Sequence, residues 1–136
     1  MSAQQVKYTV EHYRAEGISQ EAFVKWFKEY HVPIGVPLMK KYGITKYTVQ
    51  VRNHELATGF EPHLHKIRPT WEVSKADLVL EYWMPELSCL YGLVSDAEWN
   101  EKALKGQDQW LDMSRSTTHI TNEETYLEGG NILKLA

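Results

Sequence analysis

Four stretches of the chain have the hydrophobic pattern of β-strands. In the first, Val6, Tyr8, Val10 and His12 alternate with other residues, so they share one face. The third is apolar on both faces, which is typical of a strand that is covered on both sides. The predicted strands span residues 6–13, 44–52, 76–84 and 118–127.

A stripe of aromatic residues at helical spacing predicts the first helix. The stripe follows Ser19, a residue type that accepts a hydrogen bond at helix N-termini. Pro33 lacks a backbone N–H and disfavours the helical conformation of the residue before it, so this helix should end or kink near His31. The stripe consists of Phe23, Trp26, Phe27 and Tyr30.

Two further helices are predicted from their ends. A short helix spans residues 36–42 and stops at Gly43, because glycine readily takes the left-handed conformation found after helix C-termini. A later helix begins at Ser95, which forms a capping box with Glu98, and is interrupted at Gly106.

Two segments show no clear period. Residues 53–75 contain Gly59, Pro62 and Pro69, and we expect a long irregular loop there. In compact domains such a loop usually covers a site, binds a ligand or is disordered. The last residues, 128–136, are predicted to form a tail.

The resulting order βαββαβ is that of a ferredoxin-like α+β fold. We expect residues 1–136 to form a single domain, which is long enough to bury a core. The helices of this fold cover one face of the sheet, so the other apolar face needs a partner. A second copy related by two-fold symmetry is the simplest partner, and we expect a homodimer whose sheets pack face to face.

Composition narrows the class of protein. Hydrophobic residues make up 43% and charged residues 24% of the chain, as in soluble globular domains. The net charge of -3 and the dispersed basic residues disfavour a nucleic-acid partner. No apolar run spans a bilayer and the N-terminal segment lacks signal-peptide features, so we expect a cytoplasmic protein without a membrane partner. Cys89 is the single cysteine, which excludes intrachain disulfides and cysteine-based zinc sites.

The first helix and the residues that follow it resemble a known family. The run FVKWFKEYHVP at 23–33, followed by VPLMK at 36–40, resembles the EthD-like branch of the dimeric α+β barrel superfamily. Further stretches, in the same order through nearly the whole chain, are similar to small EthD-type proteins of fungal aromatic polyketide pathways. They are EHYR at 11–14, WEV at 71–73, residues 77–83, DAEW at 96–99, WLD at 110–112 and TYLE at 125–128.

This resemblance implies an activity. Members of that group are cofactor-free decarboxylases or dehydratases that act on anthrone-type and atrochrysone-type carboxylic acids. The resemblance therefore implies a lyase of secondary metabolism that removes carbon dioxide or water from a fused-ring polyketide acid without a cofactor.

Both reactions need proton transfer, which histidine provides near neutral pH. Loss of carbon dioxide leaves an enolate, which needs a donor on the ketone and an acid that returns a proton to carbon. Loss of water needs a base at the α-proton and an acid at the leaving oxygen. His31 is the first candidate, because it follows Phe23 and Phe27 at intervals of four and shares their aromatic face. The alternative is a histidine that only caps the end of the helix.

Two other histidines are candidates for proton transfer. His12 shares a strand face with Tyr8 and Val10 and should point toward the core, where an ordinary core histidine is the alternative. His119 lies on a polar face of the last predicted strand, which could line a cavity, meet solvent or meet a dimer partner.

Asp77 and Glu81 lie on one face of the third predicted strand. A carboxylate there, Asp77 in the first place, could orient a histidine or act as the base. The alternative is an ion pair with Lys46 or Arg52 from the neighbouring strand.

Candidates for substrate binding are of three kinds. Arg68, in the predicted loop, could bind a substrate carboxylate through two hydrogen bonds. Trp26 and Tyr30 are expected in the core first, and as a wall for a flat ligand second. Phenol groups could donate to a ligand oxygen, and the sequence does not rank them. These tyrosines are Tyr8, Tyr47 and Tyr82.

Three histidines in the predicted loop, His54, His63 and His65, raise the question of a metal site. Two histidines with one residue between them are common by chance on an extended segment. No well-placed carboxylate or cysteine completes a ligand set, so we expect no metal.

The sequence thus predicts a homodimeric α+β barrel enzyme that decarboxylates or dehydrates an aromatic polyketide acid by general acid–base catalysis. Three alternatives remain open. They are isomerisation, cyclisation or cofactor-free oxygenation of an anthrone on the same fold, a non-catalytic polyketide-binding protein, and an interaction protein with a filled interior. The fold alone does not choose among them.

Overall fold

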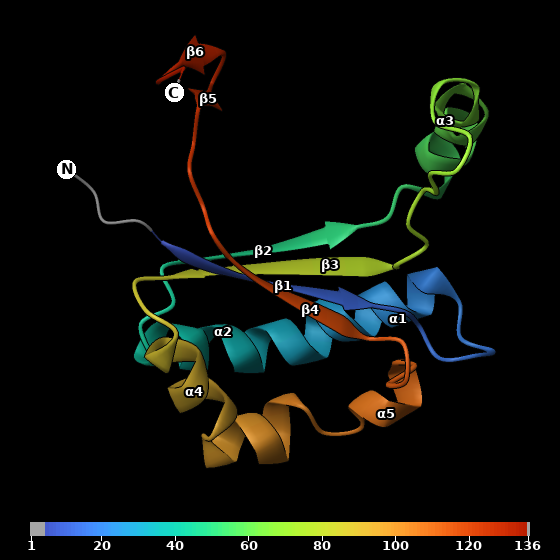
Figure 1. The fold of residues 1–136 in the computed structure, drawn as a ribbon. Coiled ribbons are helices and arrows are strands. Elements are labelled where there is room, and N and C mark those ends of the chain that lie inside the picture. Colours follow the sequence, from blue (N-terminus) through green and yellow to red (C-terminus); the bar gives the residue numbers. More distant parts are fainter. Residues whose placement is uncertain (1–4, 136) are drawn as a thin grey trace.

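The computed structural model describes residues 5–135. Its centre is a four-stranded antiparallel sheet with the strand order β2-β3-β1-β4. Helices cover one face of this sheet (Figure 1). The predicted ferredoxin-like α+β fold is therefore confirmed. The strands are β1 (Val6–His12), β2 (Lys46–Val51), β3 (Leu78–Met84) and β4 (Thr117–Asn122).

The helical layer consists of two chain segments on the same side of the sheet (Figure 1). The first comprises α1 (Gln20–Trp26), the π-helical segment η1 (Phe27–His31) and α2 (Val32–Lys41). The second comprises α4 (Ser88–Val94), the π-helical segment η2 (Trp99–Ala103) and α5 (Gln107–Trp110). Within residues 5–135, no helix combines the length and the hydropathy needed to cross a membrane.

The sequence predicted that the first helix ends or kinks near His31; it does not end there, but continues through Pro33 as α2. The N–H of Val32 bonds to the carbonyl of Phe27, five residues earlier, which is the spacing of a π-helix. This wider turn carries the carbonyls ahead of Pro33 out of the α-helical register, so the missing N–H of the proline does not stop the helix. The separate helix predicted at 36–42 is therefore the last part of one long helix.

The prediction of an irregular loop over residues 53–75 is wrong for most of this segment, because α3 (His54–Ile67) lies within it. Asn53 caps this helix, and its side-chain Oδ1 accepts a hydrogen bond from the N–H of Leu56 at 3.0 Å. Pro62 lies inside the helix. Hydrophobic residues spaced by four, four and three were the signal of a helix here: Leu56, Phe60, Leu64 and Ile67.

The structure also differs from the prediction in the helical segments between residues 86 and 106. Residues 86–94 had no predicted element, and most of them form α4. The N-cap of the following helical turn is Asp96 rather than Ser95, since Asp96 Oδ1 accepts a hydrogen bond from the N–H of Trp99 at 3.0 Å. The interruption predicted at Gly106 is present, where the residue has a φ of 75°.

The last predicted strand is shorter than expected, and the predicted tail contains a hairpin. Strand β4 ends at Asn122, and β5 (Leu127–Glu128) pairs with β6 (Asn131–Ile132). Gly129 and Gly130 connect them with φ values of 57° and 80°, which L side chains rarely adopt. This C-terminal hairpin and α3 both project on the side of the sheet that the helices leave open (Figure 1).

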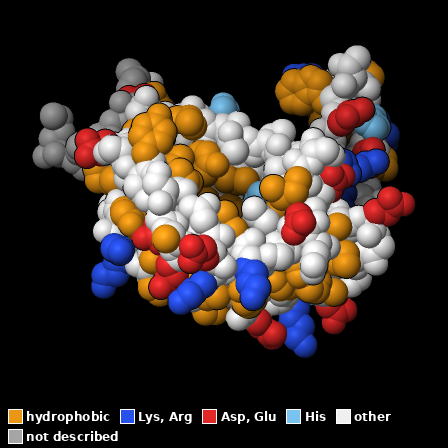
Figure 2. Space-filling view, turned by 90° about the horizontal axis from the view of Figure 1, so that it is seen from below, with side chains coloured by type: hydrophobic (Ala, Val, Ile, Leu, Met, Phe, Trp, Pro, Cys, Tyr) orange, Lys and Arg blue, Asp and Glu red, His pale blue; other side chains and the backbone are white. Residues whose placement is uncertain are grey.

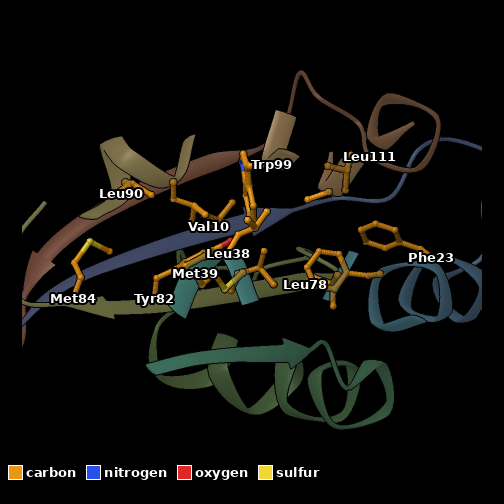
Figure 3. Packing of buried hydrophobic residues seen from close by; sticks show 14 residues of the cluster. Val10, Phe23, Leu38, Met39, Leu78, Tyr82, Met84, Leu90, Trp99 and Leu111 are labelled. Carbon is orange, nitrogen blue, oxygen red and sulfur yellow. The ribbon is translucent and has the colours of Figure 1, made fainter. Parts of the chain in front are cut away.

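The hydrophobic core lies between the sheet and the helical layer (Figure 3). Alternate residues of β3 face this core, and all are almost fully buried: Leu78, Leu80, Tyr82 and Met84. We predicted an apolar open face, and this prediction is wrong: Glu81 in its centre pairs with Lys7 and accepts a hydrogen bond from Gln50. Seen from the helix side, α3 forms a lobe that stands away from the body (Figure 2).

Candidate functional site

His31 lies at the centre of the helical layer, with only 4% of its surface exposed. Its Nδ1 lies 2.9 Å from the carbonyl oxygen of Ala103 in η2. Because a carbonyl can only accept, Nδ1 carries the proton and Nε2 keeps a free lone pair. The ring centroid lies 4.7 Å from that of Phe27 and 5.3 Å from that of Trp99. His31 is therefore held in one orientation and one tautomer.

The two π-helical segments hold this arrangement together. Besides the bond of His31, the hydroxyl of Tyr30 donates to the carbonyl of Lys102 at 2.9 Å. Both donors lie in η1 and both acceptors in η2. Single π-helical turns are frequent at functional sites because they re-aim side chains that an α-helix would place elsewhere.

His12 extends from β1 toward the same interior. Its Nδ1 lies 2.8 Å from the hydroxyl oxygen of Ser116. Burial, and then the proximity of His31, lower the pKa of His12 from 6.5 to about 4. Burial also lowers the pKa of His31, although the hydrogen bond with Ala103 acts in the opposite direction. Both imidazoles are thus neutral at pH 7, which is the form that accepts a proton.

Three tyrosines line the interior beside the sheet. The ring of Tyr82 lies 4.7 Å from that of Tyr47 and 5.4 Å from that of Tyr8. Burial raises the pKa of all three phenols. They remain protonated at neutral pH and can each donate a hydrogen bond.

A wall of stacked aromatic rings closes the interior near α5. The ring of Trp26 is parallel within 8° to that of Trp110, at a centroid distance of 5.5 Å. The ring of Tyr30 is also stacked with that of Trp26, at a centroid distance of 6.2 Å. Trp26 and Tyr30 thus do take part in an aromatic wall, with Trp110 as an additional member.

The two carboxylates proposed from the sequence do not contact a histidine among the described residues. Asp77 accepts hydrogen bonds from the backbone N–H and the guanidinium of Arg14. Glu81 bonds to Lys7 and Gln50 on the open face. The ion pairs expected with Lys46 or Arg52 are replaced by these partners, because β1 and the segment that follows it, rather than β2, supply the cations.

Two other candidates lie away from the buried histidines. His119 is paired with Thr9 in register, so its side chain is on the open face of the sheet, opposite to His12. Arg68 follows the last residue of α3, and its Nη1 donates to the carbonyl of Ile67 at 2.9 Å. Its guanidinium lies 5.5 Å from the ring centre of Trp71, on the exposed surface.

The histidines of the predicted loop lie on α3. His63 and His65 are two residues apart in a helix, where side chains point in different directions, so the extended geometry assumed for a metal pair is absent. His65 Nε2 instead lies 3.1 Å from the carbonyl of Trp71. Across residues 5–135, no group of three or more potential metal ligands comes together.

Sequence reasoning missed three contributors to the site. Ser116 orients His12, the carbonyl of Ala103 orients His31, and Gly35 allows the side chains of His31 and Trp99 to lie close to the backbone of α2. A Cβ atom on Gly35 would lie 3.6 Å from His31 Nε2 and 3.1 Å from Trp99 Cζ3. A glycine inside a helix is a sequence signal of close approach, and Gly35 could have been found in this way. No local signal marks the other two.

The fold and its interior define the class of protein: a ferredoxin-like α+β domain with two neutral histidines between sheet and helices, of which His31 is buried and His12 half-buried. Residues 15–114 match the EthD domain, and the chain belongs to the EthD domain family. The resemblance that the sequence motifs indicated is thereby confirmed.

Curated relatives and solved structures are consistent with this assignment. The chain is 46% identical to the dehydratase iacD of Pestalotiopsis fici, over 93% of this chain and 91% of that protein. It is 26% identical to the conidial pigment biosynthesis dehydratase EthD of Metarhizium robertsii, over 92% and 87%. A dimeric ferredoxin-like protein of unknown function from Thermobifida fusca has the same fold, with a TM-score of 0.54, 7% identity and coverage of 90% and 93%. Because dehydratases are lyases, the predicted enzyme class is confirmed at this level.

Proposed function

We propose that this protein is a dehydratase of a hydroxylated, fused-ring aromatic polyketide acid, with His31 and His12 as its proton-transfer groups. The observation that carries this proposal is the pair of neutral histidines in the interior: His31 is buried in one tautomer that leaves a lone pair on Nε2, and His12 is half-buried. The dehydratase names of the two relatives support the loss of water as the favoured reaction.

The first step is removal of the proton next to a ketone. His31 Nε2 takes this proton, and the electron pair moves to the ketone oxygen as an enolate. A phenol donor from the tyrosines beside the sheet stabilises the enolate oxygen. The Ala103 carbonyl stabilises the imidazolium that forms, because it accepts the hydrogen bond of Nδ1–H.

The second step expels the hydroxyl group on the neighbouring carbon. The enolate pair returns to form the carbon–carbon double bond, and the leaving oxygen takes a proton to depart as water. The imidazolium of His31 holds the proton removed in the first step, and His12 can relay it to a leaving group on the far side of the ring. Both histidines end neutral, so the scheme needs no metal or other cofactor.

Decarboxylation of the same class of acid remains a second reaction that the resemblance implies. It would use the same phenol donors on the ketone, and a neutral histidine would take the carboxyl proton of the acid and return it to carbon after carbon dioxide has left. The two reactions differ in product mass, since one releases water and the other carbon dioxide.

We also propose that the protein acts as a homodimer through the open face of the sheet. Two projections on that side expose hydrophobic residues, and one of the neighbours in fold is a dimeric protein. On α3 and beyond it these residues are Leu56, Phe60, Ile67 and Trp71. On and around the C-terminal hairpin they are Tyr126, Leu127, Ile132, Leu133 and Leu135.

The test is turnover of an atrochrysone-type carboxylic acid by the purified protein in the presence of a chelator. Product masses and carbon dioxide are followed against a reaction without enzyme, because such acids also lose carbon dioxide spontaneously. Accelerated loss of water supports the dehydratase, and accelerated loss of carbon dioxide alone replaces it with the decarboxylase. No acceleration of either reaction contradicts the proposed substrate class.

A further inference from the structure

The helical layer leaves the edge strand β4 uncovered. Ile120 of β4 lies directly opposite Tyr8 of β1, so both side chains are on the helix side of the sheet. Exposure rises across this row toward the edge: Tyr82 in β3 is 4% exposed, Tyr8 is half-buried and Ile120 is 52% exposed. Thr118, opposite the buried Val10, is exposed as well. The interior between sheet and helices is therefore open along β4.

Two groups that can bind a ligand lie beside this opening along β4. Tyr8 and His12 are four residues apart on β1 and share its helix side, with about 13 Å between their Cα atoms. Ser116 directly precedes β4, and its hydroxyl oxygen lies 2.8 Å from Nδ1 of the half-buried His12. Because Nδ1 is engaged there, Nε2 is the nitrogen of His12 that is left for a ligand.

The three tyrosines beside the sheet differ in their access to this opening. Within residues 5–135, the polar side-chain atoms that are shielded from solvent without a hydrogen-bond partner are the hydroxyls of Tyr47 and Thr48. A ligand that enters from solvent therefore does not meet the Tyr47 hydroxyl. The ring of Tyr82 is buried between those of Tyr47 and Tyr8. Tyr8 is the tyrosine next to β4, and burial raises the pKa of its phenol, so the phenol keeps a proton that it can donate.

The groups around the opening suit a flat aromatic ligand with oxygen atoms at its edge. At the end near His12, α5 supplies Trp110, a member of the stacked aromatic wall. Its carbonyl accepts a hydrogen bond at 2.7 Å from the N–H of Ala15, three residues after His12. Aromatic rings pack on such apolar and aromatic side chains, and Tyr8 offers a donor to a ring oxygen. The residues of β4 on the helix side are uncharged: Thr118, Ile120 and Asn122.

We propose that a fused-ring aromatic acid enters the interior along β4 and lies against Ile120, with Tyr8 donating to its ketone oxygen and His12 Nε2 in contact with its other end. This inference rests on the proposed function for the identity of the ligand. It names the entrance, the phenol donor among the three tyrosines and the histidine that the ligand meets first. His31, with 4% of its surface exposed, lies deeper in the interior.

The donor is tested with anthraquinone-2-carboxylic acid, a tricyclic acid that undergoes neither dehydration nor the proposed decarboxylation. Its affinity is measured by titration of the wild-type protein and of Tyr8→Phe, which removes only the hydroxyl. We expect a roughly tenfold loss of affinity, since one such hydrogen bond contributes about 1.4 kcal/mol. Tyr47→Phe is the matched control and should bind like the wild type, because its hydroxyl is shielded from solvent. Equal affinity of Tyr8→Phe and wild type, an equal loss in Tyr47→Phe, or absence of binding overturns Tyr8 as the donor.

The entrance is tested by Ile120→Asp, which places a charge where the rings of the ligand would lie. We expect the affinity for the same acid to fall about tenfold or more, since a carboxylate loses its water when an apolar ring covers it. Val36→Asp is the matched control, because Val36 is an exposed apolar residue on α2, and it should bind like the wild type. An equal loss in both variants, or no loss in Ile120→Asp, overturns β4 as the entrance.

Contact with His12 is tested on the wild-type protein with diethyl pyrocarbonate, which acylates neutral imidazole nitrogens. At ten times its Kd the acid leaves about one protein molecule in eleven free, so modification of the His12 peptide should slow about tenfold. His119, on the open face of the sheet, is the internal control and should react at an unchanged rate. Mass spectrometry follows both peptides.

These measurements separate the inference from the function on which it rests, because none of them depends on turnover. If His12 is not protected by the acid but reacts faster when the protein is diluted, a second copy of the chain covers β4 and the inference is overturned. If all three results are as expected and no acid is turned over, the binding site stands and the dehydratase is contradicted. If an acid is turned over while Tyr8→Phe and Ile120→Asp bind like the wild type, the dehydratase stands and this entrance is overturned.

Discussion

The two faces of the sheet are built from alternating residues of the same strands, yet their polar groups differ in charge and in pairing. On the helix side, His12 and Tyr47 are half-buried and Tyr82 is buried, and desolvation shifts their pKa values toward the neutral forms. On the open side, Glu81 is buried and pairs with Lys7 and Gln50. Neutral groups on one face are available for proton transfer, whereas paired charges on the other face stabilise structure.

The largest expected difference between the faces concerns turnover. His31→Ala should lower the turnover of the polyketide acid about 10²–10⁴-fold, because it removes the proposed base. His119→Ala, on the open face, should keep a rate close to that of the wild type. The initial rates of both variants are measured after circular dichroism has shown that they are folded. Equal losses of turnover in both variants would contradict the assignment of the chemistry to the helix side of the sheet.

A second prediction concerns the space beside His31. Gly35→Ala places a Cβ 3.1 Å from Trp99 Cζ3, so the ring must move. We expect the free energy of unfolding to fall by about 1–3 kcal/mol, as for other overpacked cores.

Gly59→Ala is the matched control for that substitution. Gly59 lies in α3 with nothing within 4 Å of its would-be Cβ, and alanine should stabilise the helix by about 0.5–1 kcal/mol. Urea denaturation measures both variants. A stable Gly35→Ala protein would show that the interior is looser than the contacts indicate.

The third prediction is a dependence of stability on pH. In the unfolded chain a histidine takes up a proton near pH 6.5, whereas folding lowers the pKa of His12 to about 4. The unfolded state therefore binds more protons between these values, and the folded state loses stability as the pH falls from 6.5 to 4. Above pH 6.5 this contribution is fully present.

His12→Gln removes that titration, so its stability should fall less steeply over the same interval. Urea midpoints of both proteins at pH 7.5, 5.5 and 4.5 give the comparison. Parallel curves for the two proteins would contradict the burial of a neutral His12.

The smallest expected effect lies on the open face. Glu81→Gln removes the charge opposite Lys7, and partly exposed ion pairs contribute about 0.5–1 kcal/mol. We expect a loss of that size in urea denaturation, with unchanged turnover. A marked loss of turnover would place the open face within the active site, and a change in the dimer fraction by analytical ultracentrifugation would place Glu81 at the interface.

Much of the site could be predicted because its side chains lie on regular elements. Alternation along β1 placed Tyr8 and His12 on the core side, and helical spacing placed His31 among aromatic residues. The partners of these groups could not be predicted. Ser116 and Ala103 are 104 and 72 residues away in sequence from the histidines that they bond, and no local pattern encodes such a pairing.

By itself, the sequence determined where the four main strands follow one another along the chain. It also determined the aromatic stripe of the first helix and the membership of the EthD family. These follow from local periodicity, end signals and motifs, each contained within a short stretch of chain. Only the tertiary structure decided that the first helix passes Pro33 through a π-helical turn, that residues 54–67 form a projecting helix, and that Asp77 pairs with Arg14. The packing of distant segments decides these features, because it outweighs the small local preferences of a proline, a glycine or a single charge.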